Sequence, residues 1–181
     1  MTAEPVKHGR RIEPLLDASA SNDVADRPAR PINIRGTLAR SPELASAFSK
    51  LAGPLVFGQR SLSRRDKELV ILRVGWNSQS VYEFGQHTLF GRAEGLTDQE
   101  IAQLAGAPGE WPPNDATLVA FVDELCENND VTDQTWAALA SRFTEADLVE
   151  LLLLAGFYRM VSGLLNSVGV ELESWTPGWP E

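Results

Sequence analysis

Two ionisable side chains stand four positions apart in the stretch "VYEFGQH", residues 81–87: Glu83 and His87. Residues three or four apart share one face of an α-helix, so Ser80 projects to the same side as this pair. A carboxylate and an imidazole on one face can act as general acid and base. The same spacing is also typical of a surface ion pair, or of core polar groups that satisfy one another. The spacing alone leaves both interpretations open.

Capping patterns predict the helices that position these groups. Ser63 followed by Asp66 predicts the start of a helix over roughly 64–77, which contains a dense run of apolar residues. The next helix is predicted over 80–95 and ends at Gly95. Ser80, Glu83 and His87 are therefore expected on the second of two consecutive helices.

The rest of the chain also carries helix signals, and no run shows convincing strand alternation. Helices are predicted from Ser41-Pro42-Glu43, with an interruption at Gly53-Pro54, from Thr97 with Glu100, over 116–130, over 133–143, and from Thr144 with Asp147 toward Ser167. The proline-containing residues 1–35 predict an extended N-terminal arm. We predict an all-α protein in which residues 36–181 form a single domain.

Composition and charge exclude some classes of binding partner. The 181 residues include 16 Lys and Arg against 25 Asp and Glu, a net charge of −9. From residue 93 onward there are only two basic residues, Arg142 and Arg159. Such a surface repels phosphate backbones and anionic lipids, so neither nucleic acid nor membrane is expected as a partner.

Cysteine usage and the N-terminal sequence indicate a cytoplasmic protein. Cys126 is the single cysteine, which excludes an intramolecular disulfide and any CxxC motif. It is expected to behave as a small hydrophobic side chain without chemistry. The first residues lack the apolar stretch of a signal peptide.

The segment 148–165 is the most apolar part of the chain and approaches the length of a membrane span. Glu150, Arg159 and Ser162 interrupt it, and no basic cluster flanks it, so a buried helix is the better interpretation. A helix that is apolar nearly all round must be central or lie at a subunit interface. We therefore predict a homo-oligomer.

The pieces "RDKELVILR", "YEFGQH" and "GLTDQEI", in this order and spacing, resemble the carboxymuconolactone decarboxylase family, which includes the alkylhydroperoxidase D-like proteins. The resemblance extends from about Leu38 to Glu173. It implies an alkylhydroperoxidase D-like helical bundle that assembles as a homo-oligomer, often a trimer or hexamer.

The peroxidase branch of this family has a glutamate, eleven residues, a Cys-x-x-Cys pair, three residues and a histidine. Glu68 and His87 match the glutamate and the histidine, whereas Ser80 and Glu83 occupy the cysteine positions. A hydroxyl and a carboxylate cannot cycle between dithiol and disulfide. The resemblance therefore does not carry the peroxidase activity over to this chain.

What the resemblance leaves is a candidate catalytic set of Glu68, Glu83 and His87. Two carboxylates held close together cannot both ionise cheaply, so one is expected to keep its proton while the other stays charged beside the imidazole. Such a set suits decarboxylation or isomerisation of a small organic acid or lactone without a cofactor. Two carboxylates and a histidine also resemble a metal-binding triad, but they supply only three ligands and the family does not generally depend on metal.

Ser80, Tyr82 and Trp76 are the candidate substrate-binding residues, because they lie beside this set in the sequence. Each also has an ordinary structural role, as a helix cap, a bonded hydroxyl or a core aromatic. The alternative to an enzyme is a binding or structural oligomer that keeps the fold without catalysis. A cavity that reaches Glu83 and His87 would favour the enzyme, and a closed cluster would favour the alternative.

Overall fold

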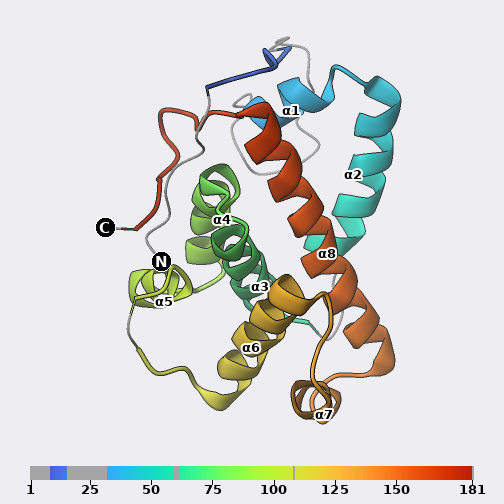
Figure 1. The fold of residues 1–181 in the computed structure, drawn as a ribbon, viewed down its shortest axis with the longest axis vertical. Coiled ribbons are helices and arrows are strands. Elements are labelled where there is room, and N and C mark those ends of the chain that lie inside the picture. Colours follow the sequence, from blue (N-terminus) through green and yellow to red (C-terminus); the bar gives the residue numbers. More distant parts are fainter. Residues whose placement is uncertain (1–8, 16–31, 59–61, 108, 181) are drawn as a thin grey trace.

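The computed structural model describes residues 9–15, 32–58, 62–107 and 109–180. Within these ranges the chain forms helices and no strand, which confirms the predicted all-α class (Figure 1). The helices are α1 (Asn33–Leu38), α2 (Pro42–Phe57), α3 (Arg64–Asn77), α4 (Val81–Ala93), α5 (Asp98–Leu104), α6 (Pro113–Asn128), α7 (Asp133–Ala140) and α8 (Glu145–Val168).

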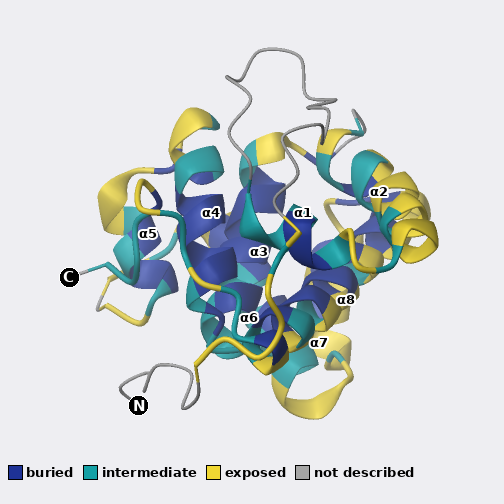
Figure 2. Ribbon diagram, turned by 90° about the horizontal axis from the view of Figure 1, so that it is seen from above, coloured by how far each residue is buried: buried dark blue, intermediate teal, exposed yellow. Residues whose placement is uncertain are grey.

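Helix α3 is the centre of the bundle. It contacts α2, α4, α5, α6 and α8. Its apolar run has no exposed surface at Leu69, Val70, Ile71, Leu72 and Val74. Figure 2 shows α3 and α4 buried in the middle, while the outer side of α2 is exposed. The predicted helix pair 64–77 and 80–95 thus forms the interior against which the other helices pack.

The predicted caps are present, and two helix boundaries differ from expectation. The Ser63 hydroxyl accepts a hydrogen bond from the Asp66 N–H, and Thr97 and Thr144 begin α5 and α8 with complete capping boxes. The predicted interruption at Gly53-Pro54 is wrong, because α2 continues through Pro54 and ends only at Phe57. Helix α6 begins at Pro113, before the predicted start at 116, since proline is well tolerated at a first helical position.

A buried lysine ties three helices together. Lys67 on α3 is 1% exposed, and its Nζ donates to the carbonyls of Leu55 and Gly58, both at 2.9 Å, and to Glu150 Oε1 on α8 at 2.6 Å. A buried ammonium requires such partners, because an unpaired charge in the interior is strongly unfavourable. Lys67 therefore fixes the C-terminal end of α2 and the N-terminal half of α8 relative to α3.

The predicted arm is only partly described by the structure. Residues 9–15 contain no helix, and their backbone bonds to the end of α8 and to α1, through Arg11 N to Val168 O at 2.8 Å and Leu15 N to Gly36 O at 2.9 Å. Residues 1–8 and 16–31 lie outside the described part. Helix α1, which the sequence analysis missed, crosses the predicted boundary at residues 35 and 36.

The C-terminal segment after α8 runs back past α4 (Figure 1). Glu173 in this segment accepts hydrogen bonds from the Asn33 N–H of α1 and from the Tyr82 hydroxyl of α4, both at 2.7 Å, and from the Gln86 amide. Trp179 packs against Phe84, with ring centroids 5.0 Å apart. The segment therefore joins α1 to α4.

Gly85 allows this close approach, and Gly85→Ala is expected to disrupt it. A Cβ at this position would lie 2.1 Å from the Pro177 carbonyl oxygen, a backbone atom that cannot simply rotate away. We expect the variant to lose about 1–3 kcal/mol of unfolding free energy, as overpacking does. Thermal denaturation measures the loss. Gly178→Ala is the control, because no atom lies within 4 Å of its added Cβ, and an equal loss in both variants would contradict the explanation.

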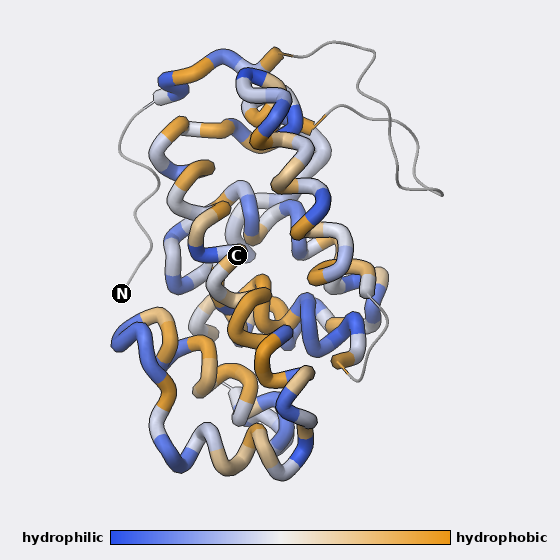
Figure 3. Tube along the Cα trace, turned by 90° about the vertical axis from the view of Figure 1, so that its right-hand side faces the viewer, coloured by the Kyte–Doolittle hydropathy of each residue, from blue (hydrophilic) through white to orange (hydrophobic). Residues whose placement is uncertain are grey.

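Helix α8 is long and apolar enough to cross a membrane by length and composition, but more than half of its most apolar window is buried inside the bundle. It contacts α2, α3, α4 and α7, as the core helix of a bundle does. Figure 3 shows hydrophobic and hydrophilic stretches alternating along the helices, the pattern of amphipathic helices around a shared core. This agrees with the prediction of a buried helix.

The outward face of α8 supports the predicted homo-oligomer. Val149, Leu153 and Met160 are each more than half exposed, and they alternate with exposed Gly156 and Gly163 at spacings of three and four residues. This spacing forms one apolar stripe along the helix, and glycines permit another helix to approach closely. We propose that a second copy of the chain covers the stripe.

Light scattering of the purified protein tests this prediction. The particle mass is expected to be at least twice the 19.8 kDa of one chain. Leu153→Lys combined with Met160→Lys should reduce the particle mass to that of one chain. The matched control, Lys50→Glu, changes an exposed charge on α2 and should keep the assembly. A parent protein that scatters as a single chain at micromolar concentration would refute the oligomer.

Candidate functional site

A cavity of about 130 Å³ lies between α1 and α2 on one side and α4 and α8 on the other. Helix α4 contributes its polar wall, which consists of Tyr82, Glu83, Gln86 and His87. The opposite wall, from α1, its preceding residue and α2, is formed by Ile32, Ile34, Phe48 and Ala52. Helix α8 closes the cavity with Phe157, Tyr158, Val161 and Leu165.

His87 is held by Glu68 and not by Glu83. The distance from His87 Nδ1 to Glu68 Oε2 is 2.7 Å, and both side chains are buried. Because a carboxylate only accepts hydrogen bonds, Nδ1 carries the hydrogen, and Nε2 has a lone pair whenever the imidazole is neutral. No described residue forms a hydrogen bond with Nε2. A carboxylate therefore orients the imidazole from α3, while the other ring nitrogen remains available to a ligand.

Glu83 shares a helix face with His87 but forms no hydrogen bond with it. Glu83 is 2% exposed, and among the described residues neither of its carboxyl oxygens has a hydrogen-bond partner. Burial raises the pKa of Glu83 well above its ordinary value of 4.5, and the nearby Ser162 hydroxyl only partly opposes this effect. Gly75 of α3 lies against the carboxyl, since a Cβ there would be 3.5 Å from Glu83 Oε1. Glu83 is thus a buried carboxylic acid that keeps its proton to unusually high pH.

Two tyrosines border the cavity in different ways. The Tyr82 hydroxyl is already bonded, because it donates to Glu173 and accepts from the Ile34 N–H at 3.2 Å. Tyr158 packs edge-on against the His87 ring, with centroids 4.9 Å apart. Burial, and then the charges of Glu68 and Glu83, raise the pKa of Tyr158 well above its usual value. Tyr158 therefore stays protonated beside the two carboxyl groups.

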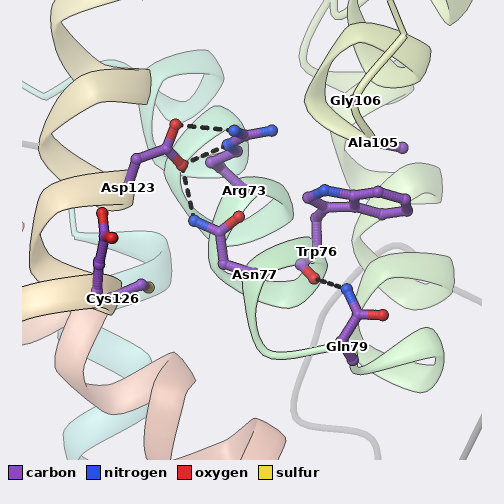
Figure 4. Close-up of a pocket in the computed structure, with 9 residues that line it drawn as sticks. Arg73, Trp76, Asn77, Gln79, Ala105, Gly106, Asp123 and Cys126 are labelled. Atoms are coloured by element: carbon purple, nitrogen blue, oxygen red, sulfur yellow. Dashed lines mark hydrogen bonds and ion pairs between the residues drawn. The ribbon is translucent and has the colours of Figure 1, made fainter. Parts of the chain in front are cut away.

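The other predicted substrate-binding residues lie outside this cavity. Ser80 is fully buried at the start of α4, where its hydroxyl has no partner among the described residues, and it does not line the cavity. Trp76 lies in a separate, open groove of about 700 Å³ between α3, α6 and the end of α5, shown in Figure 4. The structure therefore brings Glu68, Glu83, His87 and Tyr82 together but places Trp76 elsewhere.

The groove at Trp76 is larger than the cavity, but its polar side chains are less suited to catalysis. Arg73 and Asn77 both bond to Asp123, at 2.6 Å and 2.7 Å from its Oδ1, and these contacts are visible in Figure 4. Burial raises the pKa of the Cys126 thiol in this groove, so the thiol resists ionisation. We therefore assign the candidate site to the smaller cavity, where a ring nitrogen and a carboxylic acid form no hydrogen bond with any described residue.

The described residues contain no group of three or more His, Cys, Asp or Glu side chains arranged to hold a metal ion. Glu68 bonds to His87 Nδ1, and Glu83 makes no bond to either residue. The metal-binding alternative for Glu68, Glu83 and His87 therefore finds no support in the geometry of these side chains.

Comparison with protein families identifies the segment that carries these groups. The model of the carboxymuconolactone decarboxylase family matches residues 42–113, from the start of α2 to the start of α6. This segment belongs to the carboxymuconolactone decarboxylase family. Glu68, Ser80, Glu83 and His87 all lie within the family segment, whereas Tyr158 and Ser162 lie beyond it on α8. No curated protein sequence matches the chain significantly.

Solved structures confirm the alkylhydroperoxidase D-like fold. An uncharacterised peroxidase-related protein from Silicibacter sp. TM1040 has a TM-score of 0.75 and 16% identity, covering 93% of this chain and 96% of its own. An alkylhydroperoxidase core protein from Ralstonia eutropha JMP134 has a TM-score of 0.70 and 20% identity, with 76% and 75% coverage. A debrominase in complex with 2,3,4-tribromopyrrole has a TM-score of 0.67 and 12% identity, with 80% and 79% coverage. At these identities the likeness establishes the fold.

The sequence analysis missed the contribution of α8 to the site. Tyr158 and Ser162 are four residues apart and therefore share the helix face that meets Glu83 and His87. This spacing of two hydroxyl side chains within an apolar helix was the available signal. Glu173, which accepts hydrogen bonds from Tyr82 and Gln86, lies outside any helix, so no sequence periodicity could reveal its role.

Proposed function

We propose that the chain is an enzyme without redox thiols that transfers protons on a small organic molecule, in a decarboxylation or an isomerisation. The observation that carries this proposal is the Glu68–His87 hydrogen bond of 2.7 Å beside a cavity lined by Glu83, whose carboxyl group has no hydrogen-bond partner in the described part of the chain. The cavity reaches both Glu83 and His87, which favours an enzyme over a purely structural oligomer.

The geometry assigns different roles to the three groups. His87 Nε2 is the proton acceptor, and Glu68 holds the ring orientation and stabilises the imidazolium that forms. Glu83 is a neutral acid that can donate a hydrogen bond to a carbonyl oxygen of the substrate. The two carboxyl groups differ in environment, since Glu68 bonds to an imidazole and Glu83 is buried without a hydrogen bond to any residue that the structure describes. Environments that separate the pKa values of two acids are typical of acid/base sites.

The debrominase shows that chemistry other than peroxide reduction occurs on this fold. Fold alone does not determine a reaction, so the proposal rests on the side chains in the cavity. Hydrogen–deuterium exchange in heavy water provides the test. Small ketones and lactones incubated with the protein should exchange the hydrogens next to their carbonyl groups faster than without it, as measured by proton NMR. An exchange rate equal to the uncatalysed rate across the panel would contradict the proposal.

The chain is expected to lack thiol-dependent peroxidase turnover. Ser80 and Glu83 occupy the positions where the peroxidase pattern has its cysteines, and Cys126 lies on α6 in the separate groove. A dithiol mechanism requires two thiols that can form a disulfide. Peroxide consumption coupled to a thiol reductant should equal the rate of the reductant alone. Coupled turnover that persists in Cys126→Ser would prove this expectation wrong.

A further inference from the structure

The charge of the cavity sets a condition on what can enter it. Among the described residues, no lysine or arginine lines it, and the side chains that line it from outside α4 are apolar except for the Tyr158 hydroxyl. Glu83 is a buried acid that makes no hydrogen bond within the described ranges, and Glu68 is bonded to His87. The Glu68–His87 pair carries no net charge when the imidazole is protonated and one negative charge when it is neutral. Neither state attracts an anion.

The burial of the lining side chains increases the free-energy cost of placing a charged ligand in the cavity. Tyr82, Glu83 and His87 are all less than a tenth exposed, so a ligand beside them leaves most of its water behind. A carboxylate moved from water into such a site loses its hydration and requires a cation or several donors in return. A cation would need a free carboxylate, but Glu68 already bonds to His87, and Glu83 would have to give up a proton that its burial helps it to retain.

The volume limits the size of the ligand. An apolar cavity of about 150 Å³ holds one benzene molecule. The cavity here measures about 130 Å³, and aromatic side chains of Phe48, Phe90 and Phe157 contribute to its walls. It therefore fits a molecule of roughly one small ring, with one polar atom directed at α4.

On the basis of the proposed function, we infer that the substrate is a small, uncharged, ring-sized carbonyl compound such as a lactone or cyclic ketone, and that the reaction is an isomerisation. A decarboxylation would begin with a carboxylate, which the lining disfavours. His87 and Glu83 line the same cavity from one helix face, while the Glu83 carboxyl oxygens are buried toward Gly75 and α8. The proposed reaction requires the Glu83 carboxyl to turn toward the cavity, where a carbonyl oxygen that it contacts places the neighbouring carbon near His87.

The proposed step is balanced without another reactant. His87 Nε2 removes a proton from the carbon next to the carbonyl, and the electron pair of that C–H bond forms a carbon–carbon double bond. The electron pair of the C=O double bond moves to the oxygen, which takes the Glu83 proton, so an enol forms. In a substrate with a further carbon–carbon double bond next to the enolising carbon, this enol is a conjugated dienol. His87 then returns its proton to the far carbon of the dienol while the oxygen returns its proton to Glu83 and the carbonyl forms again, which yields an isomer and restores both side chains.

Isothermal titration with three compounds of the same shape tests the substrate class independently of turnover. Cyclobutanecarboxamide is neutral, cyclobutanecarboxylate is an anion and cyclobutanecarboxamidinium is a cation at pH 7. The amide is expected to bind about tenfold or more tightly than either ion, because only the ions lose charge solvation. Ala52→Phe and Val161→Phe each fill the cavity and should abolish the binding. Two positions are used so that one poorly folded variant does not decide the result.

The outcomes separate this inference from the proposed function. Tighter binding of the carboxylate or the amidinium would overturn the neutral substrate class, while deuterium exchange lost in His87→Ala would still support proton transfer. Amide binding without any exchange would leave the class intact and contradict the proposed function. No binding of any compound, or amide binding that persists in both filled variants, would overturn the inference.

Discussion

His87→Ala should fold and assemble as the parent does but lose activity by about 10²–10⁴-fold, the contribution of a general base. The reason is geometric, since Glu68 holds Nδ1 at 2.7 Å and leaves Nε2 without a described partner beside the cavity. The rate of hydrogen–deuterium exchange on the responding carbonyl compound provides the measurement. Adding imidazole to the variant should restore part of the rate, because the truncated side chain leaves room next to Glu68.

Two companion variants distinguish a base from a structural residue. Glu68→Gln keeps a polar partner for the ring but removes the carboxylate, so kcat is expected to fall less than in His87→Ala and without a large change in KM. Arg92→Ala on the exposed end of the same helix removes an ion pair with Asp98 and should leave the rate unchanged. If His87→Ala lowers the melting temperature yet retains activity within a few-fold of the parent, His87 is structural.

The sequence predicted the helices around the site because their signals are local. Ser63, Thr97 and Thr144 are side chains that bond to backbone three residues later, and each begins a helix as expected. Helix α1 escaped prediction because it has only six residues, no side-chain cap and an entry next to a proline. Its position depends on contacts that are distant in sequence, such as Asn33 with Glu173.

The pairing within the site could not be read in the same way. Helical spacing places Glu83 and His87 on one face, but it does not say which residue of another helix reaches the ring. In the structure Glu68 reaches it from α3, and Glu83 instead turns toward Gly75 and α8. Trp76 was placed beside the set because it is near in sequence, whereas in the structure it lines the separate groove between α3, α6 and the end of α5. Tertiary packing decided these points.

Glu83→Gln is expected to lose most of the activity. Its free energy of unfolding should exceed that of the parent by an amount that grows as the pH increases. The folded chain holds the Glu83 proton more tightly than the unfolded chain does, because burial raises its pKa well above 4.5. Above about pH 4.5 the unfolded chain loses this proton while the folded chain retains it, so the free energy of unfolding falls with rising pH until the folded pKa is passed. Each pKa unit of difference corresponds to about 1.4 kcal/mol. Glutamine has nearly the same shape and does not titrate, so the variant escapes this loss.

Melting temperatures of parent and Glu83→Gln between pH 4 and pH 8 measure the difference, which should grow steadily in favour of the variant across this window. Glu124→Gln is the control with the opposite sign. The Thr135 hydroxyl and the Thr132 N–H lower the pKa of Glu124, so its stabilising contribution is present at neutral pH and disappears in acid. That variant should therefore be less stable than the parent at pH 7 and approach it as the pH falls. If the melting temperatures of the parent and Glu83→Gln change in parallel with pH, the folded chain binds the Glu83 proton no more tightly than the unfolded chain does. Glu83 would then not be the protonated buried acid on which the proposed proton transfer depends.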